Sequence, residues 1–297
     1  MEQSKISSYC LNCILEKQER KYALVKDEEQ QAAYKKAVEE AVKNRRPTDS
    51  APVLVADLER VQEQFLGKTD IFGPIKEKYN RIMMELAPEI QEQIDAAEDS
   101  LAQALVFARA GNFIDFGAMH DVDDAIMHQL LREAPKLQPD AKEYEAFQKD
   151  LSLAKTLVYL TDNCGEIVLD KLFLQEIQKA YPQIAITVIV RGAPVINDAT
   201  MEDAQMVGLT EIHGIRVIGN GAAIAGTELT RISDEARNVL ECADVMISKG
   251  QGNFETLHGC GMNIYYLFLC KCDWFSISLE LPKLSGVFRN ERNLGSK

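Results

Sequence analysis

The chain has 297 residues, of which 46% are hydrophobic and 27% charged, so it can bury a core and is not a disordered protein. Its 33 basic and 46 acidic residues give a formal net charge of −13, which argues against nucleic acid or an anionic membrane as a partner, because both bind basic surfaces. The N-terminus has no apolar core of signal-peptide length and the seven cysteines fit a reduced protein, so we expect a cytoplasmic location.

The first half of the chain has the pattern of helices, with strong helix formers and apolar residues three and four apart. Three segments are predicted to be helical: residues 27–44, 51–67 and 74–112. Gly67 is a typical helix stop, Pro88 predicts a break or a start within the third segment, and Gly111 predicts its end. We therefore expect a mainly helical domain over residues 1–150.

After about residue 154 the pattern changes to short apolar runs rich in Val and Ile, most of them separated by helical segments. These runs are TLVYLT (156–161), IAITVIV (184–190), IRVIG (215–219), DVMIS (244–248) and NIYYLFL (263–269). Such alternation predicts a parallel sheet covered by helices on both faces. We therefore expect a Rossmann-like α/β/α domain over residues 151–297. The apolar stretch 263–281 contains Lys271 and Asp273, so it predicts buried strands rather than a membrane span.

Polar side chains follow the predicted strands, at the edge where such sheets bind ligands. The candidates are Asp162, Asn163, Glu166, Arg191, Asp198, Lys249, Asn253 and Glu255. Hard oxygen ligands without a His cluster suit Mg²⁺ or Mn²⁺, and Arg191 and Lys249 are suited to hold phosphate oxygens. Asp-Asn pairs are also common as turns and helix caps, but their repetition after successive strands favours a metal and phosphate site.

Four segments together resemble the damage-control phosphatase family of metal-dependent phosphatases. They are ARAGNFIDFG (108–117), DNCGE (162–166), RGAPVINDAT (191–200) and SKGQGNFE (248–255). The resemblance implies a helical domain beside an α/β/α sandwich, with a divalent metal (Mg, Mn, Co or Ni) held by Asp162, Asn163 and Asp198. It also implies phosphate or substrate contacts at residues such as Glu166, Arg191 and Lys249. Many relatives have Ala at the position of Cys164, which need not touch the metal.

We therefore expect a divalent-metal-dependent phosphatase that hydrolyses small phosphorylated metabolites, such as sugar phosphates or related damaged metabolites. In this hypothesis Arg191 and Lys249 offset charge on the phosphoryl group, and Glu166 or another acid positions the attacking water. One alternative is a non-catalytic protein that binds a nucleotide or a sugar phosphate in the same crevice. Another is a dinucleotide-dependent oxidoreductase that uses GNGAAIAG (219–226), although Gly226 comes too late for the dinucleotide fingerprint.

The cysteines raise a separate possibility, a second metal. Cys10 and Cys13 have metal-ligand spacing, and Cys270 and Cys272 lie on a predicted strand, where alternate side chains share a face. Together they could bind zinc or an iron–sulfur centre, and the alternative is ordinary buried thiols that pack as small hydrophobic groups. The four histidines have no catalytic or metal-binding spacing, and we expect structural or surface roles for them. They are His120, His128, His213 and His258.

Overall fold

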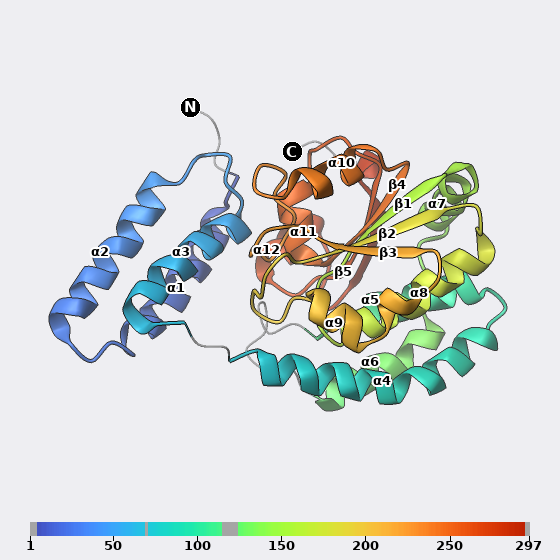
Figure 1. Cartoon of the computed structure of the whole chain (residues 1–297), viewed down its shortest axis with the longest axis horizontal. Coiled ribbons are helices and arrows are strands. Elements are labelled where there is room, and N and C mark those ends of the chain that lie inside the picture. Colours follow the sequence, from blue (N-terminus) through green and yellow to red (C-terminus); the bar gives the residue numbers. More distant parts are fainter. Residues whose placement is uncertain (1–4, 69–70, 115–123, 295–297) are drawn as a thin grey trace.

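The computed structural model describes residues 5–68, 71–114 and 124–294. It consists of an N-terminal bundle of helices and a larger body built around one sheet (Figure 1). In Figure 1 the bundle, in blue, lies beside the body on the side of α11 and α12.

The bundle contains α1 (Ser8–Tyr22), α2 (Glu28–Asn44) and α3 (Ala51–Leu66). The side chain of Asp27 accepts a hydrogen bond from the Gln30 amide at 2.8 Å and so caps α2, while Gly67 ends α3 with a φ of 75°. Buried side chains such as Tyr34 form a core of the bundle's own. On its other side α3 presents Val53 to the core of the body, which fixes the bundle against it.

Four helices follow before the first strand: α4 (Gly73–Asp95), α5 (Ser100–Gly111), α6 (Asp124–Glu133) and α7 (Ala141–Leu153). The predicted end at Gly111 is confirmed, but the predicted break at Pro88 is wrong, because α4 continues through it. Proline removes one hydrogen bond to the carbonyl four residues earlier. That residue is Met84, which is 40% exposed, so water can replace the lost bond in a helix that packing already holds.

The sheet has six strands: β1 (Thr156–Leu160), β2 (Ala185–Val190), β3 (Ile215–Gly219), β4 (Val245–Lys249), β5 (Ile264–Leu269) and β6 (Gly286–Asn290). Their order is β3-β2-β1-β4-β5-β6, with β1 to β5 parallel and β6 antiparallel to β5. The predicted α/β fold and its five parallel strands are therefore confirmed. The sequence pattern missed β6, a short edge strand that begins with glycine and carries Arg289 and Asn290.

Five further helices connect the strands: α8 (Glu166–Ala180), α9 (Met201–Met206), α10 (Asp234–Glu241), α11 (Gly250–Leu257) and α12 (Asp273–Leu279). Short 3₁₀ turns cover Ala134–Lys136, Leu209–Glu211 and Glu291–Asn293. The expectation of strands throughout residues 263–281 is wrong in its second half, because α12 starts directly after Cys272. Among the described residues, no helix is long and apolar enough to cross a membrane.

The two faces of the sheet bury different cores. On β1, Tyr159 belongs to a core shared with α4, α5, α7 and α8, whereas Val158 and Leu160 belong to the core under α10, α11 and α12. This alternation follows from the two-residue period of a strand. Because α4, α5 and α7 share a core with the sheet, the division into a helical domain 1–150 and an α/β domain 151–297 stays a prediction.

The strand order reverses between β1 and β4. The chain runs from β1 outward to β2 and β3, and then returns to the other side of β1 to form β4, β5 and β6. In doubly wound sheets, such a reversal opens a crevice at the carboxyl ends of the two central strands, where ligands bind. Here those ends are Leu160 and Lys249.

Candidate functional site

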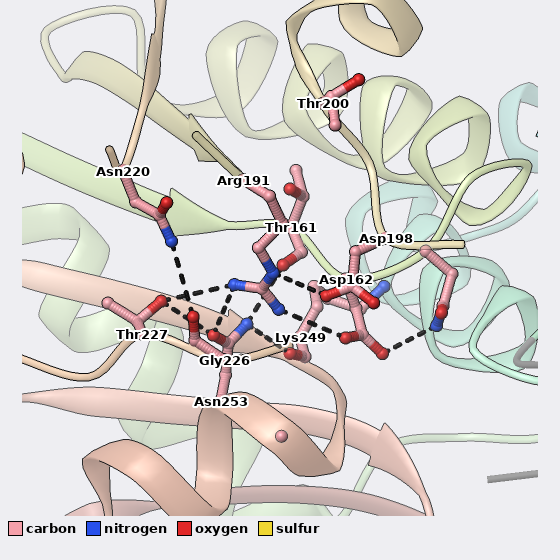
Figure 2. A network of polar contacts seen from close by, with 12 residues as sticks. Thr161, Asp162, Arg191, Asp198, Thr200, Asn220, Gly226, Thr227, Lys249 and Asn253 are labelled. Carbon is pink, nitrogen blue, oxygen red and sulfur yellow. Dashed lines mark hydrogen bonds and ion pairs between the residues drawn. The ribbon is translucent and has the colours of Figure 1, made fainter. Parts of the chain in front are cut away.

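Three loops bring polar side chains together at this reversal point. Asp162 follows β1, Arg191 directly follows β2, and Lys249 is the last residue of β4. Leu160 on β1 is level with Ile189 on β2 and with Ser248 on β4, so the three strands end together. Figure 2 shows the resulting cluster of side chains.

The three predicted metal ligands lie next to one another. Asn163 and Asp198 are paired in an isolated antiparallel bridge, and the amide of Ala199 donates to the Asp162 carbonyl at 2.7 Å. The Asn163 side-chain amide donates to Asp162 Oδ2 at 2.7 Å. The loop after β2 therefore folds back onto the loop after β1 and places two carboxylates and one amide side by side.

Arg191 links the two carboxylates from within the protein. Its Nε lies 2.6 Å from Asp198 Oδ2 and its Nη2 lies 3.5 Å from Asp162 Oδ1. Its Nη1 donates to Asn253 Oδ1 at 2.9 Å, so in Figure 2 the guanidinium lies between the two aspartates and Asn253. The side chain is only 1% exposed. The structure pairs Arg191 with two candidate metal ligands, and its expected contact with phosphate oxygens stays a prediction.

Lys249 is fully buried and its three N–H groups have three protein acceptors. Nζ lies 2.8 Å from the Ala108 carbonyl, 2.6 Å from Glu166 Oε1 and 2.5 Å from Asp170 Oδ1. Burial acts to lower the pKa of Lys249, but the attraction of Asp170 and Glu166 outweighs it and raises the pKa above its ordinary value. Lys249 is therefore a fixed positive charge below the end of β4.

Glu166, the first residue of α8, is held by several donors. Besides Lys249, it accepts hydrogen bonds from the side-chain amides of Asn163, at 2.9 Å, and Asn112, at 3.0 Å. It is 0% exposed. These contacts fix the Glu166 carboxylate within the cluster, and the prediction that Glu166 or another acid positions the attacking water stays a prediction.

Sequence reasoning missed Asn112, which caps α5. Its Nδ2 lies 3.0 Å from both Asp162 Oδ2 and Glu166 Oε1, and its Oδ1 accepts from the Leu269 amide at the end of β5. One residue thus joins α5, the loop after β1, α8 and β5. Its signals in the sequence are its place directly after Gly111, where asparagine is an ordinary helix cap, and its position inside the segment ARAGNFIDFG that resembles the family.

Asp170 and Tyr159 were missed as well. Tyr159 donates its hydroxyl proton to Asp170 Oδ1 at 2.7 Å, and both residues are fully buried. Burial raises the pKa of Asp170, although Lys249 acts to lower it. Asp170 comes four residues after Glu166 on α8 and so lies on the same helix face. That spacing is the signal that could have identified it.

Gly250 brings the start of α11 into contact with Asp162. Its φ is +79°, and a Cβ at this position would lie 2.0 Å from Asp162 Oδ2. Only glycine both adopts this conformation readily and leaves room for the carboxylate. The amino-terminal end of α11 therefore packs directly against one of the candidate metal ligands.

The structure brings Asn253 into the cluster but not Glu255. The Asn253 amide donates to the carbonyls of Thr161, at 3.1 Å, and Lys249, at 2.7 Å, which fixes the oxygen that faces Arg191. Glu255 comes two residues later on α11, and residues two apart on a helix point in different directions. Its Oε1 lies 3.9 Å from the Cys10 thiol, on the side of the bundle.

The donor set fits a hard divalent cation. The buried cluster contains four carboxylates and two basic side chains, which leaves two negative charges when all are ionised: Asp162, Glu166, Asp170 and Asp198 against Arg191 and Lys249. Buried charge is costly unless it is balanced. Two of the carboxylates, Asp162 and Asp198, lie beside the Asn163 amide, and such oxygens are the ligands that Mg²⁺ and Mn²⁺ prefer.

The structure does not support the predicted cysteine-bound metal. Cys270 follows β5 and lies 3.5 Å from Ser276 Oγ, while Cys272 comes directly before α12 and accepts from the Gln251 amide at 3.6 Å. Cys10 and Cys13 lie on α1. Within the described ranges, no group of three His, Cys, Asp or Glu side chains is arranged to hold a metal ion, and this applies to the carboxylates of the main cluster as well, where the candidate set is two aspartates and the Asn163 amide.

The glycine-rich loop after β3 differs from a dinucleotide site. In the fingerprint the strand leads straight into a helix, whose amino-terminal end binds the pyrophosphate. Here β3 ends at Gly219 and the next helix starts only at Asp234. The loop serves the cluster instead, because Thr227 donates to Asn253 Oδ1 at 2.8 Å.

Two of the described histidines, His213 and His258, make their contacts outside the cluster. His258 Nδ1 lies 3.1 Å from Glu291 Oε2, and the backbone carbonyl of His213 accepts from the Gln178 side chain. His128 lies on α6, and His120 lies outside the described residues.

Comparison with known proteins identifies similar chains over nearly the whole length. A model of the damage-control phosphatase ARMT1-like domain matches residues 6–283. A protein of Archaeoglobus fulgidus named damage-control phosphatase is 31% identical over 278 residues, covering 91% of this chain and 93% of that protein. A damage-control phosphatase of Pyrococcus horikoshii is 32% identical over 225 residues, covering 74% of each. The crystal structure of a DUF89 family protein from Pyrococcus horikoshii matches with a TM-score of 0.79 and 25% identity, covering 96% of this chain and 98% of that one.

Proposed function

Because this chain belongs to the damage-control phosphatase ARMT1-like family, we propose that it is a divalent-metal-dependent phosphatase acting on small phosphorylated metabolites. The observation that carries the proposal is the buried cluster at the reversal point of the sheet. Its two neighbouring carboxylates and amide, Asp162, Asp198 and Asn163, come from the loops after β1 and β2. Their geometry supports a metal-assisted reaction at the edge where such folds bind ligands.

The proposed metal ligands are Asp162, Asn163 and Asp198. A divalent cation bound there would polarise a phosphoryl oxygen and supply positive charge next to it. The donor chemistry supports Mg²⁺ or Mn²⁺, and Co²⁺ or Ni²⁺ would also accept the carboxylate oxygens. Arg191 keeps the two carboxylates at a fixed separation through its contacts with Asp198 Oδ2 and Asp162 Oδ1.

The basic residues would stabilise the charge that develops on the phosphoryl oxygens. Arg191 and Lys249 are buried and held by hydrogen bonds, so their positive charges do not need to reorganise during the reaction. Asn253 orients Arg191, and Glu166 with Asn112 anchors the loop that carries Asp162. The chain's own contribution in this proposal is thus two preorganised basic groups, Arg191 and Lys249, held in place beside the metal ligands.

A phosphate-release screen tests the proposal. Protein freed of metal is incubated with sugar phosphates, nucleotides and other small phosphomonoesters, without metal or with Mg²⁺, Mn²⁺, Co²⁺ or Ni²⁺. We expect phosphate release from at least one substrate class when a divalent cation is present. Release from no compound with any of the four metals would contradict the proposed function and favour a binding protein.

A further inference from the structure

Asp170 is a buried carboxylate that takes no part in holding the candidate metal ligands. It is 0% exposed, and Oδ1 accepts hydrogen bonds from Lys249 Nζ at 2.5 Å and from the Tyr159 hydroxyl at 2.7 Å. Its Oδ2 is buried and has no hydrogen-bond partner in the described part of the chain. The polar contacts of this carboxylate are therefore made with Lys249 and Tyr159.

The fold alone does not account for a carboxylate at this position. Asp170 lies inside α8, between Glu166 and Ala180, and caps no helix end. Burying a carboxylate and an ammonium together costs desolvation, and apolar residues of similar size are commonly as stable or more stable. The buried Oδ2, which has no hydrogen-bond partner in the described part of the chain, adds to this cost. A role for Asp170 in what Lys249 does is a better explanation of its presence than stability is.

Lys249 depends on Asp170 for its charge as well as for its direction. The groups around its ammonium are Glu166 and Asp170 from α8, the Ala108 carbonyl from α5, and apolar Leu267, which lies beside it on β5. Tyr159 on β1 remains neutral, because burial and Asp170 raise the pKa of its hydroxyl. Two carboxylates thus oppose the effect of burial on Lys249, and the attraction of Asp170 is the larger of the two.

We propose that Asp170 is a positioning residue for the phosphatase reaction, which holds the Lys249 ammonium charged and directed toward Glu166. Tyr159 fixes the carboxylate by donating to the same oxygen that Lys249 contacts. The charge and direction of the Lys249 ammonium, at the end of β4, therefore depend on Asp170 and Tyr159. The catalytic consequence of this inference rests on the proposed function, whereas the dependence of Lys249 on Asp170 does not.

The first test compares Asp170→Asn with the matched control Asp150→Asn. Asp150 also accepts from a tyrosine hydroxyl, that of Tyr265 at 2.8 Å, and pairs with Arg292, but it lies at the other end of the sheet. We expect Asp170→Asn to lower kcat/KM about 10-fold or more. We also expect the alkaline limb of its pH profile to move to lower pH, because Lys249 loses an opposite charge. The control should keep the wild-type profile, and an unchanged profile in Asp170→Asn would overturn the proposal.

The second test needs no activity and uses a double-mutant cycle of thermal stability. In the wild-type background, Asp170→Asn should lower the melting temperature, because Lys249 loses a partner. In a Lys249→Met background the same change should raise it, because it removes a buried charge that no longer has a counter-charge. A decrease in both backgrounds would indicate a purely structural Asp170 and would overturn the proposal.

The cycle also separates this inference from the proposed function. If the wild-type protein releases no phosphate, the proposed function fails, while the sign reversal of the stability change still decides whether Asp170 serves Lys249. If Asp170→Asn alone does not fold, the double variant Lys249→Met/Asp170→Asn carries the test. Recovery of the folded state in the double variant supports the pairing, and a double variant that stays unfolded contradicts it.

Discussion

Gly250 is the position at which the addition of a single methyl group reaches the candidate metal site most directly. We expect Gly250→Ala to lose nearly all phosphatase activity while the protein stays folded. The reason is the contact between the start of α11 and Asp162, since a Cβ at residue 250 would lie 2.0 Å from Oδ2 and 2.1 Å from Cγ of that carboxylate.

The magnitude follows from two separate costs. A left-handed backbone at a non-glycine residue costs about 1–2 kcal/mol, which lowers stability without touching the site. Non-bonded carbon atoms pack at about 3.5–4.0 Å, so the Asp162 carboxylate has to retreat by more than about 1 Å. A displacement of about 1 Å in a reacting constellation can cost about 100-fold in rate, and we expect a loss of that size in kcat/KM.

A matched control separates the two costs. Gly261 has nearly the same backbone conformation, with a φ of +78°, but a Cβ there would meet nothing within 4 Å. Both variants are compared by thermal melting and by metal-dependent phosphate release. We expect Gly261→Ala to lose stability only. If the turnover of Gly250→Ala stays within about 3-fold of that of Gly261→Ala, a displacement of about 1 Å at Asp162 does not matter and the reasoning is refuted.

Three further results are expected. Asp198→Asn should fold and lose about 100-fold in metal-dependent turnover, because an amide binds a hard cation weakly; near-normal phosphate release would mean that Asp198 is only a turn or cap residue. Asn112→Ala removes the donor between Asp162 and Glu166, so kcat/KM should fall about 10-fold, and wild-type kinetics would contradict the anchoring role. Burial raises the pKa of Glu255 from 4.5 to about 7, so the native state binds more protons in that range and stability falls as pH rises through it. Thermal melts across this range should therefore show a flatter pH dependence for Glu255→Gln than for wild type, and equal slopes would refute a raised pKa for Glu255.

The sheet could be predicted from the sequence because its central strands are local patterns. Five continuous apolar runs gave β1 to β5 within one or two residues at their ends. β6 lacks that signal, since it is an edge strand with Gly286, Arg289 and Asn290 among its five residues. At Pro88 a local signal was present but misleading. Proline disfavours a helix interior, yet the tertiary packing of α4 outweighs that local preference and the helix continues.

Some residues of the candidate site could also be predicted from the sequence, and others could not. Strand-end positions gave a wider set of polar candidates at one edge of the sheet, and the family resemblance narrowed the metal ligands to Asp162, Asn163 and Asp198. No role could be assigned to Asn112, although it lies in a segment that resembles the family, or to Asp170. Each looks locally like an ordinary helix residue, and its contacts are with elements far away in the chain.

Helix geometry and burial explain the remaining differences. Glu255 was grouped with Asn253 because both follow β4, but α11 starts at Gly250 and turns their side chains apart. Arg191 and Lys249 were expected to face phosphate, and in the structure both are buried against carboxylates. The sequence indicates which types of residue lie at the site. Only the three-dimensional structure shows which positive and negative side chains pair with one another.

Removal and return of metal on a single preparation tests the central claim most directly. Phosphate release from the best substrate of the screen is measured before chelation, after exhaustive chelation, and after Mn²⁺ or Mg²⁺ is restored. The account predicts that chelation abolishes release and that the restored cation recovers it, because Asp162, Asn163 and Asp198 hold the metal that the reaction needs. Undiminished phosphate release by the fully chelated protein would contradict the metal-dependent mechanism.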